Sequence, residues 1–243
     1  MKTIVAIGAG ELKSLETFKI DKEIVSRTGK KNPVALFIPP KSRDIDYYWE
    51  IFQDVYGKKI GCKPHFLDLV RRTPTTEEMK NKVLSSDLIY IGGGNTLHFM
   101  RRIRKLGMDA LLKLAYERGI TLSGISAGAI CWFRYGMSNS NKFYHPEDWD
   151  YVRIKGMGFL PFTICPHYND EKREEDLTLL INKYGGIGIA LESGCAFEAV
   201  EDQYRIITSQ VGSQAYKIFK NKGRVVVKPI KQEKEFKPIN FLL

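Results

Sequence analysis

The chain has 243 residues, of which 43% are hydrophobic and 12% aromatic, which is enough for a buried core and excludes a wholly disordered protein. The formal net charge of +10 comes from basic residues spread along the whole chain in short runs, so we expect a solvated basic surface and no nucleic-acid partner. No stretch approaches the roughly 18 apolar residues of a membrane-spanning helix, so we expect no membrane partner.

The first two thirds of the chain alternate short β-rich runs with helical patterns. Residues 2–7 form the first apolar run, which predicts a buried strand and not a cleavable signal. Further strands are predicted at 34–38, 64–67, 88–91 and 120–123, with helices at 44–59, 76–84, 96–106 and 108–118. This alternation is typical of βαβ units and predicts a three-layer α/β/α sandwich with a mostly parallel central sheet. Because ligands bind such sheets beyond the carboxyl ends of the strands, the loops that follow strands are the candidate site.

After residue 133 the pattern changes. Residues 138–162 have no clear period, and we expect a long loop, with at most a short helix, that lies over the site or beside it. A helix at 171–183, a strand at 188–191 and a hairpin that turns at 221–223 follow. Because there is no internal repeat or linker, we expect residues 1–230 to form a single domain and residues 231–243 to form a charged C-terminal tail.

The four cysteines, Cys62, Cys131, Cys165 and Cys195, are scattered and form no CxxC pair. This spacing favours neither a zinc site nor a redox motif, so we expect no metal. Scattered cysteines in a chain of this length are typical of reduced thiols and predict a cytoplasmic protein.

The strongest local motif is Gly124-Ile125-Ser126-Ala127-Gly128. This Gly-x-Ser-x-Gly pattern comes directly after a predicted strand and before an apolar helical stretch, as a nucleophile elbow requires. In such a turn the serine hydroxyl is exposed at the edge of the sheet, and small neighbours let the backbone pass closely. Ser126 is therefore the predicted nucleophile, and the N–H group of Ala127 is a predicted oxyanion donor at the start of the next helix.

A second glycine loop, Gly92-Gly93-Gly94, follows another predicted strand. Three glycines allow a sharp turn that presents N–H groups, so Gly93 or Gly94 can supply the second oxyanion donor. A phosphate cradle and a tight turn without a ligand are alternatives, but no Gly-Lys-Ser/Thr follows, so the loop is not a P-loop. Asn95, directly after the glycines, is a candidate helix cap and a candidate substrate contact.

A serine hydrolase needs a histidine as its base, and this chain has four. His167 is favoured because it follows a short apolar run, where the site residues of α/β sheets gather. The positions of the other three, which are His65, His98 and His145, fit structural roles or the irregular segment.

The group that orients the histidine is expected to be a carboxylate at a strand end. Glu192 is favoured because it closes a predicted strand and precedes Ser193-Gly194. The competing acids are Glu147, Asp148, Asp150 and Asp170.

Together, these segments resemble the peptidase E and cyanophycinase family of serine peptidases over roughly residues 2–228. The resemblance depends on the order and spacing of the loop at 92–96, the elbow at 124–129 and Pro166-His167-Tyr168. It implies a fold related to class I glutamine amidotransferases, with Ser126 as nucleophile, His167 as base and an oxyanion hole of backbone N–H groups at Ala127 and at Gly93 or Gly94. It also places the third member of the triad at Glu192, with Asp148 or Asp150 as the older candidates.

Characterised members of this family cleave after an N-terminal aspartate, which requires a cation that faces the substrate carboxylate. Arg173 stands where peptidase E carries an arginine after its histidine motif, although the segment between His167 and Arg173 is shorter here. The structural alternative is an arginine on a helix surface, paired with Glu174 or Asp176.

These observations predict a serine-type peptidase that hydrolyses small peptides through an acyl-enzyme, without a cofactor. An esterase or amidase on another small acyl substrate would use the same residues. A non-catalytic binding protein that keeps the fold is the alternative from another class. The sequence is compatible with a homodimer.

Overall fold

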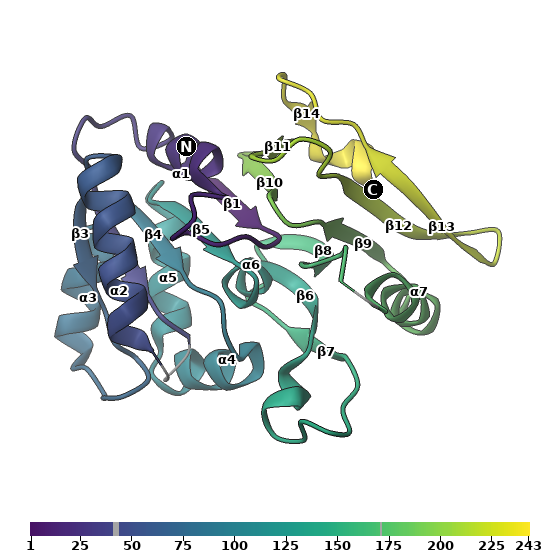
Figure 1. The fold of residues 1–243 in the computed structure, drawn as a ribbon, viewed down its shortest axis with the longest axis horizontal. Helices are drawn as coiled ribbons and strands as arrows, with labels where there is room; N and C mark the ends of the chain where they lie inside the picture. The colour runs from purple at the N-terminus through teal and green to yellow at the C-terminus, as the bar shows by residue number, and fades with distance from the viewer. Residues whose placement is uncertain (41–43, 171) are drawn as a thin grey trace.

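The strands of the protein form two sheets. The structure, a computed structural model, describes residues 1–40, 44–170 and 172–243 (Figure 1). The first sheet consists of β1 (Thr3–Ile7), β2 (Val34–Ile38), β3 (Lys63–Phe66), β4 (Leu88–Ile91), β5 (Thr121–Ile125), β10 (Cys195–Val200), β11 (Gln203–Thr208) and β14 (Lys237–Pro238). The second consists of β6 (Phe133–Ser138), β7 (Val152–Lys155), β8 (Leu160–Cys165), β9 (Ile187–Leu191), β12 (Ala215–Asn221) and β13 (Arg224–Ile230). The predicted α/β class is confirmed, and the division of the strands between two sheets refines it.

The strand order brings several carboxyl ends together. In the first sheet the order is β14-β11-β10-β1-β5-β4-β2-β3, and the pairs from β1 to β3 are all parallel. In the second sheet the order is β13-β12-β9-β8-β6-β7, and β8 is parallel to both of its neighbours. The ends of β5 and β8 are therefore flanked by parallel neighbours, where the loops of an α/β sheet form sites.

Helices cover both faces of the first sheet. Helix α1 (Phe18–Ser26), helix α2 (Ile45–Phe52) and the π-helix η1 (Gln53–Lys59) pack on one face. Helices α3 (Thr76–Leu84), α4 (Thr96–Lys105) and α5 (Met108–Glu117) pack on the other. Helix α6 (Ala127–Trp132) contacts strands of both sheets and lies between them in Figure 1, and α7 (Arg173–Tyr184) packs on the second sheet. The two 3-10 helices of the described residues are η2 (Ser140–Phe143) and η3 (Ile239–Leu242).

Strand β1 is apolar along most of its length because helices cover both of its faces. All five residues are buried. Ile4 and Ala6 join the hydrophobic cluster that contains α3, α4 and α5, whereas Val5 and Ile7 join the cluster that contains α1 and α2. Because successive side chains of a strand point to opposite faces, a strand covered by helices on both sides needs apolar residues at every position.

Several predicted elements change in the structure. The helix predicted at 44–59 is α-helical only to Phe52 and continues as the π-helix η1. The segment at 138–162 contains η2 and β7 and is not one irregular loop. Helix α1 was not predicted, because the buried Asp21 interrupts its apolar face. The predicted helix start at Glu171 lies outside the described residues.

The C-terminal part ends against the first sheet. The predicted hairpin of β12 and β13 turns at Lys222 and Gly223, which both have positive φ, as a two-residue hairpin turn requires. Within the segment predicted to be a charged tail, β14 pairs with β11, and Leu242 is buried. No helix in the described part of the chain is long and apolar enough to cross a membrane.

Candidate active site

Ser126 lies on a strained turn between β5 and α6. Its backbone has φ 55° and ψ −110°, a combination that residues other than glycine rarely adopt. The N–H group of Ser126 donates to the carbonyl of Ile7 over 3.1 Å, which ties the turn to the end of β1. A sharp strand-to-helix turn of this kind is compatible with the predicted nucleophile elbow.

The glycines of the motif are needed because the backbone passes closely at the elbow. A Cβ atom at Gly124 would lie 2.7 Å from the carbonyl carbon of Gly128. A Cβ atom at Gly128 would lie 2.7 Å from the carbonyl carbon of Ile91 and would overlap its oxygen. These are contacts with backbone atoms, which cannot rotate away, so both positions require glycine.

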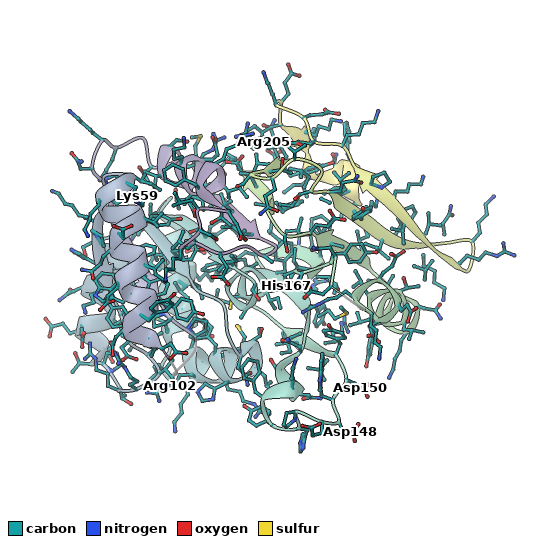
Figure 2. All side chains as sticks on the ribbon, in the orientation of Figure 1. Lys59, Arg102, Asp148, Asp150, His167 and Arg205 are labelled. Carbon is teal, nitrogen blue, oxygen red and sulfur yellow. The ribbon has the colours of Figure 1, made fainter. Side chains whose placement is uncertain are left out.

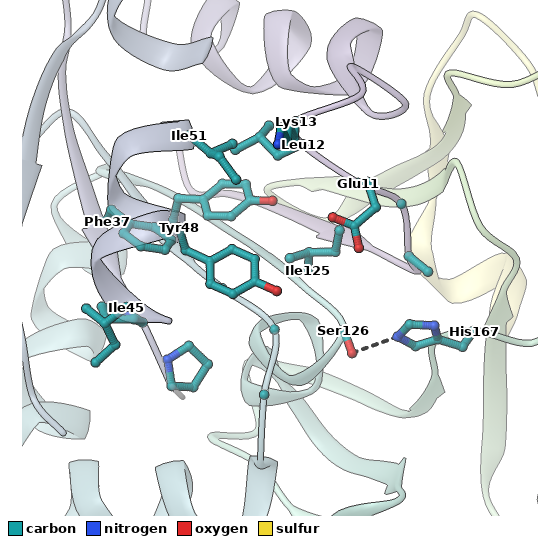
Figure 3. Close-up of a pocket in the computed structure, with 18 of the residues that line it drawn as sticks. Glu11, Leu12, Lys13, Phe37, Ile45, Tyr48, Ile51, Ile125, Ser126 and His167 are labelled. Carbon is teal, nitrogen blue, oxygen red and sulfur yellow. Dashed lines mark hydrogen bonds between the residues drawn. The ribbon is translucent and has the colours of Figure 1, made fainter. Parts of the chain in front are cut away.

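His167 comes from the second sheet and meets Ser126 across the boundary between the two sheets. It follows β8 and also has a positive φ, of 55°. Its Nε2 atom lies 2.8 Å from the Oγ atom of Ser126 (Figure 3). Burial lowers the pKa of His167, the charge of Arg173 lowers it further, and Asp170 raises it. A neutral imidazole at this distance can accept the serine proton.

Among the described residues, the carboxylate beside His167 is that of Asp170. Its Oδ2 atom lies 3.6 Å from Nδ1 of His167, and its side chain is 51% exposed. Glu192, the favoured acid of the sequence, is not brought to His167. Its carboxylate accepts hydrogen bonds from the N–H group of Gln214 (2.8 Å) and the hydroxyl of Tyr216 (3.1 Å), which hold it against β12.

Asp148 and Asp150, the older candidates for the acid, lie far from the histidine. Figure 2 shows both on the loop that leads into β7, well away from His167. The loop extends away from the sheet edge, so neither aspartate orients this histidine in the structure.

The residues predicted to supply the oxyanion donors lie beside Ser126. Ala127 is the first residue of α6, where N–H groups have no acceptor within the helix. Gly93 and Gly94 line the pocket at Ser126, and a Cβ atom at Gly93 would lie only 3.6 Å from Cβ of Ser126. Asn95 caps α4 instead, because its side chain accepts a hydrogen bond from the N–H group of His98 over 3.0 Å.

A pocket of about 320 Å³ opens in front of Ser126 and His167 (Figure 3). Its volume lies at the lower end of the range for small-molecule sites. The walls come from the loop after β1, from β2 and α2, from the glycine loop and from the segment after β6. That last segment, which was expected to lie over or beside the site, contributes Asn139 and Phe143.

The comparisons with known proteins decide the family. The sequence matches the model of peptidase family S51 over residues 4–207. The chain belongs to peptidase family S51. Together with the names of its relatives, this makes the protein a serine-type peptidase.

Two relatives and two solved structures illustrate the match. The chain is 31% identical over 235 residues to the uncharacterized peptidase YgaJ of Bacillus subtilis (strain 168), covering 95% of this chain and 97% of that protein. It is 25% identical over 200 residues to a probable alpha-aspartyl dipeptidase of Drosophila melanogaster, covering 78% and 77%. The structure of a peptidase from an acI-B1 actinobacterium has a TM-score of 0.76 at 16% identity and covers 98% of this chain and 97% of that one. A putative peptidase E of Listeria monocytogenes EGD-e has a TM-score of 0.58 at 18% identity, covering 95% and 100%. These two structures share the fold.

In this S51 peptidase Arg173 is neither a surface residue nor a wall of the pocket. It is only 3% exposed, and its guanidinium carbon lies 4.5 Å from the ring centre of Tyr151. Among the described carboxylates none forms an ion pair with it, so the pairing with Glu174 or Asp176 does not occur. Its charge instead acts on His167.

The cysteines of this S51 peptidase lie in the interior of the protein. The four cysteines are unpaired and buried, and burial raises the pKa of each thiol. No group of three or more His, Cys, Asp or Glu side chains in residues 1–40, 44–170 and 172–243 is arranged to hold a metal ion.

Sequence reasoning missed the pocket walls contributed by Glu11 and Tyr48. The signal for Glu11 was its position four residues after a predicted strand, directly after Gly8-Ala9-Gly10, a segment that matched no complete motif. Tyr48 lies on a helix whose apolar pattern gave no indication that one side faces the site.

Proposed function

We propose that this S51 peptidase hydrolyses short peptides through an acyl-enzyme on Ser126, with His167 as the general base. The observation that supports it most is the 2.8 Å distance between Nε2 of His167 and Oγ of Ser126 at a strained elbow. A nucleophile and a base within hydrogen-bond reach, with backbone donors beside them, are the parts that acyl transfer requires.

The reaction follows from these positions. Oγ of Ser126 bonds to the carbonyl carbon of the peptide while its proton passes to Nε2 of His167. The N–H groups of Ala127 and of Gly93 or Gly94 donate to the oxygen that becomes negative. His167 then gives its proton to the leaving nitrogen, the C–N bond breaks, and an ester on Ser126 remains. Water attacks this ester with His167 again as base, which releases the acid and restores the serine.

Asp170 is the positioning residue for His167 in this proposal, in the place that the sequence assigned to Glu192. A carboxylate near Nδ1 keeps the proton on that nitrogen and leaves Nε2 free to accept. The separation of 3.6 Å and the exposure of 51% make this support weaker than that of a buried acid.

The substrate class is a short peptide, because the pocket is small and one relative is named a probable alpha-aspartyl dipeptidase. Arg173 is buried against the ring of Tyr151, and this position does not support a role in binding an N-terminal aspartate. The predicted cytoplasmic location remains part of the proposal, which the four unpaired cysteines support.

The test is hydrolysis of a dipeptide panel and labelling by a fluorophosphonate probe. Ser126→Ala and His167→Ala should each lower kcat/KM by about a thousandfold or more, and Ser126→Ala should abolish labelling. His98→Ala, which changes an exposed histidine outside the pocket, is the matched control and should retain activity. Turnover that survives Ser126→Ala would overturn the proposal. Hydrolysis of esters such as p-nitrophenyl acetate without any peptide turnover would favour the esterase alternative.

A further inference from the structure

The pocket in front of Ser126 is built for an uncharged group at one end. One wall, formed by residues of β2, β4, β5 and α2, is apolar or aromatic. The residues of this wall are Phe37, Ile45, Tyr48, Ile51, Tyr90 and Ile125. An aspartate side chain placed against this wall would lose its hydration, because none of these six side chains carries a charge.

Among the described residues that line the pocket, Glu11 is the one that carries a carboxylate. The pairing of Ile7 with Ile125 places the loop after β1 at the same sheet edge as Ser126. The N–H group of Gly194 donates to the carbonyl of Ala9 over 2.8 Å, and the N–H group of Glu11 donates to Oε2 of Glu16 over 2.9 Å. This loop is therefore held at both ends.

The carboxylate of Glu11 points into the pocket. In Figure 3 it is directed toward the space between Ile125 and Tyr48, on the side of Ser126. Burial raises the pKa of the Tyr48 and Tyr90 hydroxyls, and the charge of Glu11 adds to the rise for both.

No cation of the described residues neutralises Glu11. It forms no ion pair there, and Lys13, the other charged residue of the pocket wall, donates its amino group to the hydroxyl of Tyr47 over 3.1 Å. A carboxylate that faces a pocket without a cationic partner is suited to a cation supplied by the ligand.

We infer that Glu11 binds the free α-ammonium group of the substrate while the apolar wall takes the first side chain. The enzyme then acts on peptides with an apolar residue, and not an aspartate, at a free amino terminus. The inference depends on the proposed function, because the α-ammonium group is attached only one carbon away from the carbonyl that Ser126 attacks. The preference differs from that of the aspartyl dipeptidases, where the recognised group is an anion.

The test is calorimetric binding to the Ser126→Ala protein, which holds substrates without cleaving them. Leu-Leu should bind at least about tenfold more tightly than N-acetyl-Leu-Leu, which lacks the cation, and than Asp-Leu. Adding Glu11→Gln should weaken Leu-Leu by about tenfold and leave N-acetyl-Leu-Leu within about twofold. Glu50→Gln is the matched control, since Glu50 is an exposed carboxylate of α2 outside the pocket, and it should change neither affinity.

Three outcomes would overturn the inference: equal binding of the free and acetylated peptides, tightest binding of Asp-Leu, or no binding of any of the three. Failure of the proposed function looks different. If wild-type protein cleaves Asp-Leu best and Ser126→Ala does not, the proposed function survives and the inference about Glu11 is wrong. If Leu-Leu binds selectively through Glu11 but is never cleaved, the inference about Glu11 survives and the proposed function is wrong.

Discussion

The two halves of the candidate active site are fixed by different means. Ser126 belongs to the eight-stranded sheet, and its turn is set by contacts between backbone atoms at Gly124, Gly128 and Ile91. His167 belongs to the six-stranded sheet, and its ring is set by side chains, of which Asp170 is half exposed. Backbone contacts allow no adjustment, whereas side-chain contacts at a solvent-exposed edge can be lost one at a time. The serine side should therefore fail abruptly when changed, and the histidine side gradually.

The largest effect is expected for Gly128→Ala on the serine side. The new Cβ would overlap the carbonyl of Ile91 and lie 3.0 Å from the oxygen of Gly92, and neither can rotate away. We expect a loss of about 3 kcal/mol or more in the free energy of unfolding, measured by urea denaturation. Gly93→Ala is the matched control, because its Cβ would meet only ordinary contacts, the nearest at 3.6 Å. Similar urea midpoints for the two variants would show that the turn at Ser126 is not fixed by the close backbone contacts at Gly128.

A buried carboxylate on the serine side, Asp21, offers the next largest effect. It is fully buried and accepts hydrogen bonds from Thr17 and Tyr56, both over 2.8 Å. Burial raises its pKa from 3.8 to about 7. Since the folded state holds this proton more tightly than the unfolded state, the contribution of Asp21 to stability is fully present below about pH 4 and is lost as the pH rises through 7.

Asp21→Asn should remove this loss, because the amide never ionises. From pH 5 to pH 8 the variant should gain about 2 to 4 kcal/mol in unfolding free energy relative to wild type. The measurement is urea denaturation of both proteins across this range. Parallel pH curves would mean that Asp21 is ionised in the folded protein at all these pH values.

The sequence predicted the backbone features of the serine side better than the side-chain contacts of the histidine side. The sharp turn at Ser126 was predictable because Gly-x-Ser-x-Gly specifies a close backbone approach, and the hydrophobic pattern predicted the bounds of β2, β4 and α3. Two features were not predictable locally: the break into two sheets and the choice of acid. Asp170 and Glu192 both follow a strand end in sequence, and only the hydrogen bonds of Glu192 to Gln214 and Tyr216 separate their roles.

On the histidine side, Asp170→Asn should lower kcat/KM by about tenfold, less than for a buried triad acid because Asp170 is half exposed. Glu192→Gln should change kcat/KM by less than about threefold and lower stability by about 1 kcal/mol through its lost hydrogen bond. Glu175→Gln, an exposed carboxylate of α7, is the control for charge alone. The measurement is steady-state kinetics on the best dipeptide. A larger loss for Glu192→Gln than for Asp170→Asn would restore Glu192 as the acid.

The smallest effect is expected for Arg173→Gln, which should shift the pH profile of kcat/KM. This variant tests whether Arg173 acts through His167 or on the substrate. The acidic limb of kcat/KM should report the pKa of His167, which burial lowers first and Arg173 second. Removing the guanidinium should move the limb to higher pH, although not far, because burial remains. Arg173→Lys keeps the charge and should leave the acidic limb in place.

Asp170→Asn removes a group that raises the pKa of His167 and should move the acidic limb to lower pH. If Arg173 instead contacts the substrate, Arg173→Gln would raise KM for Asp-Leu and leave the limb unchanged, so the direction of the shift tells a residue that acts through His167 from one that acts on the peptide.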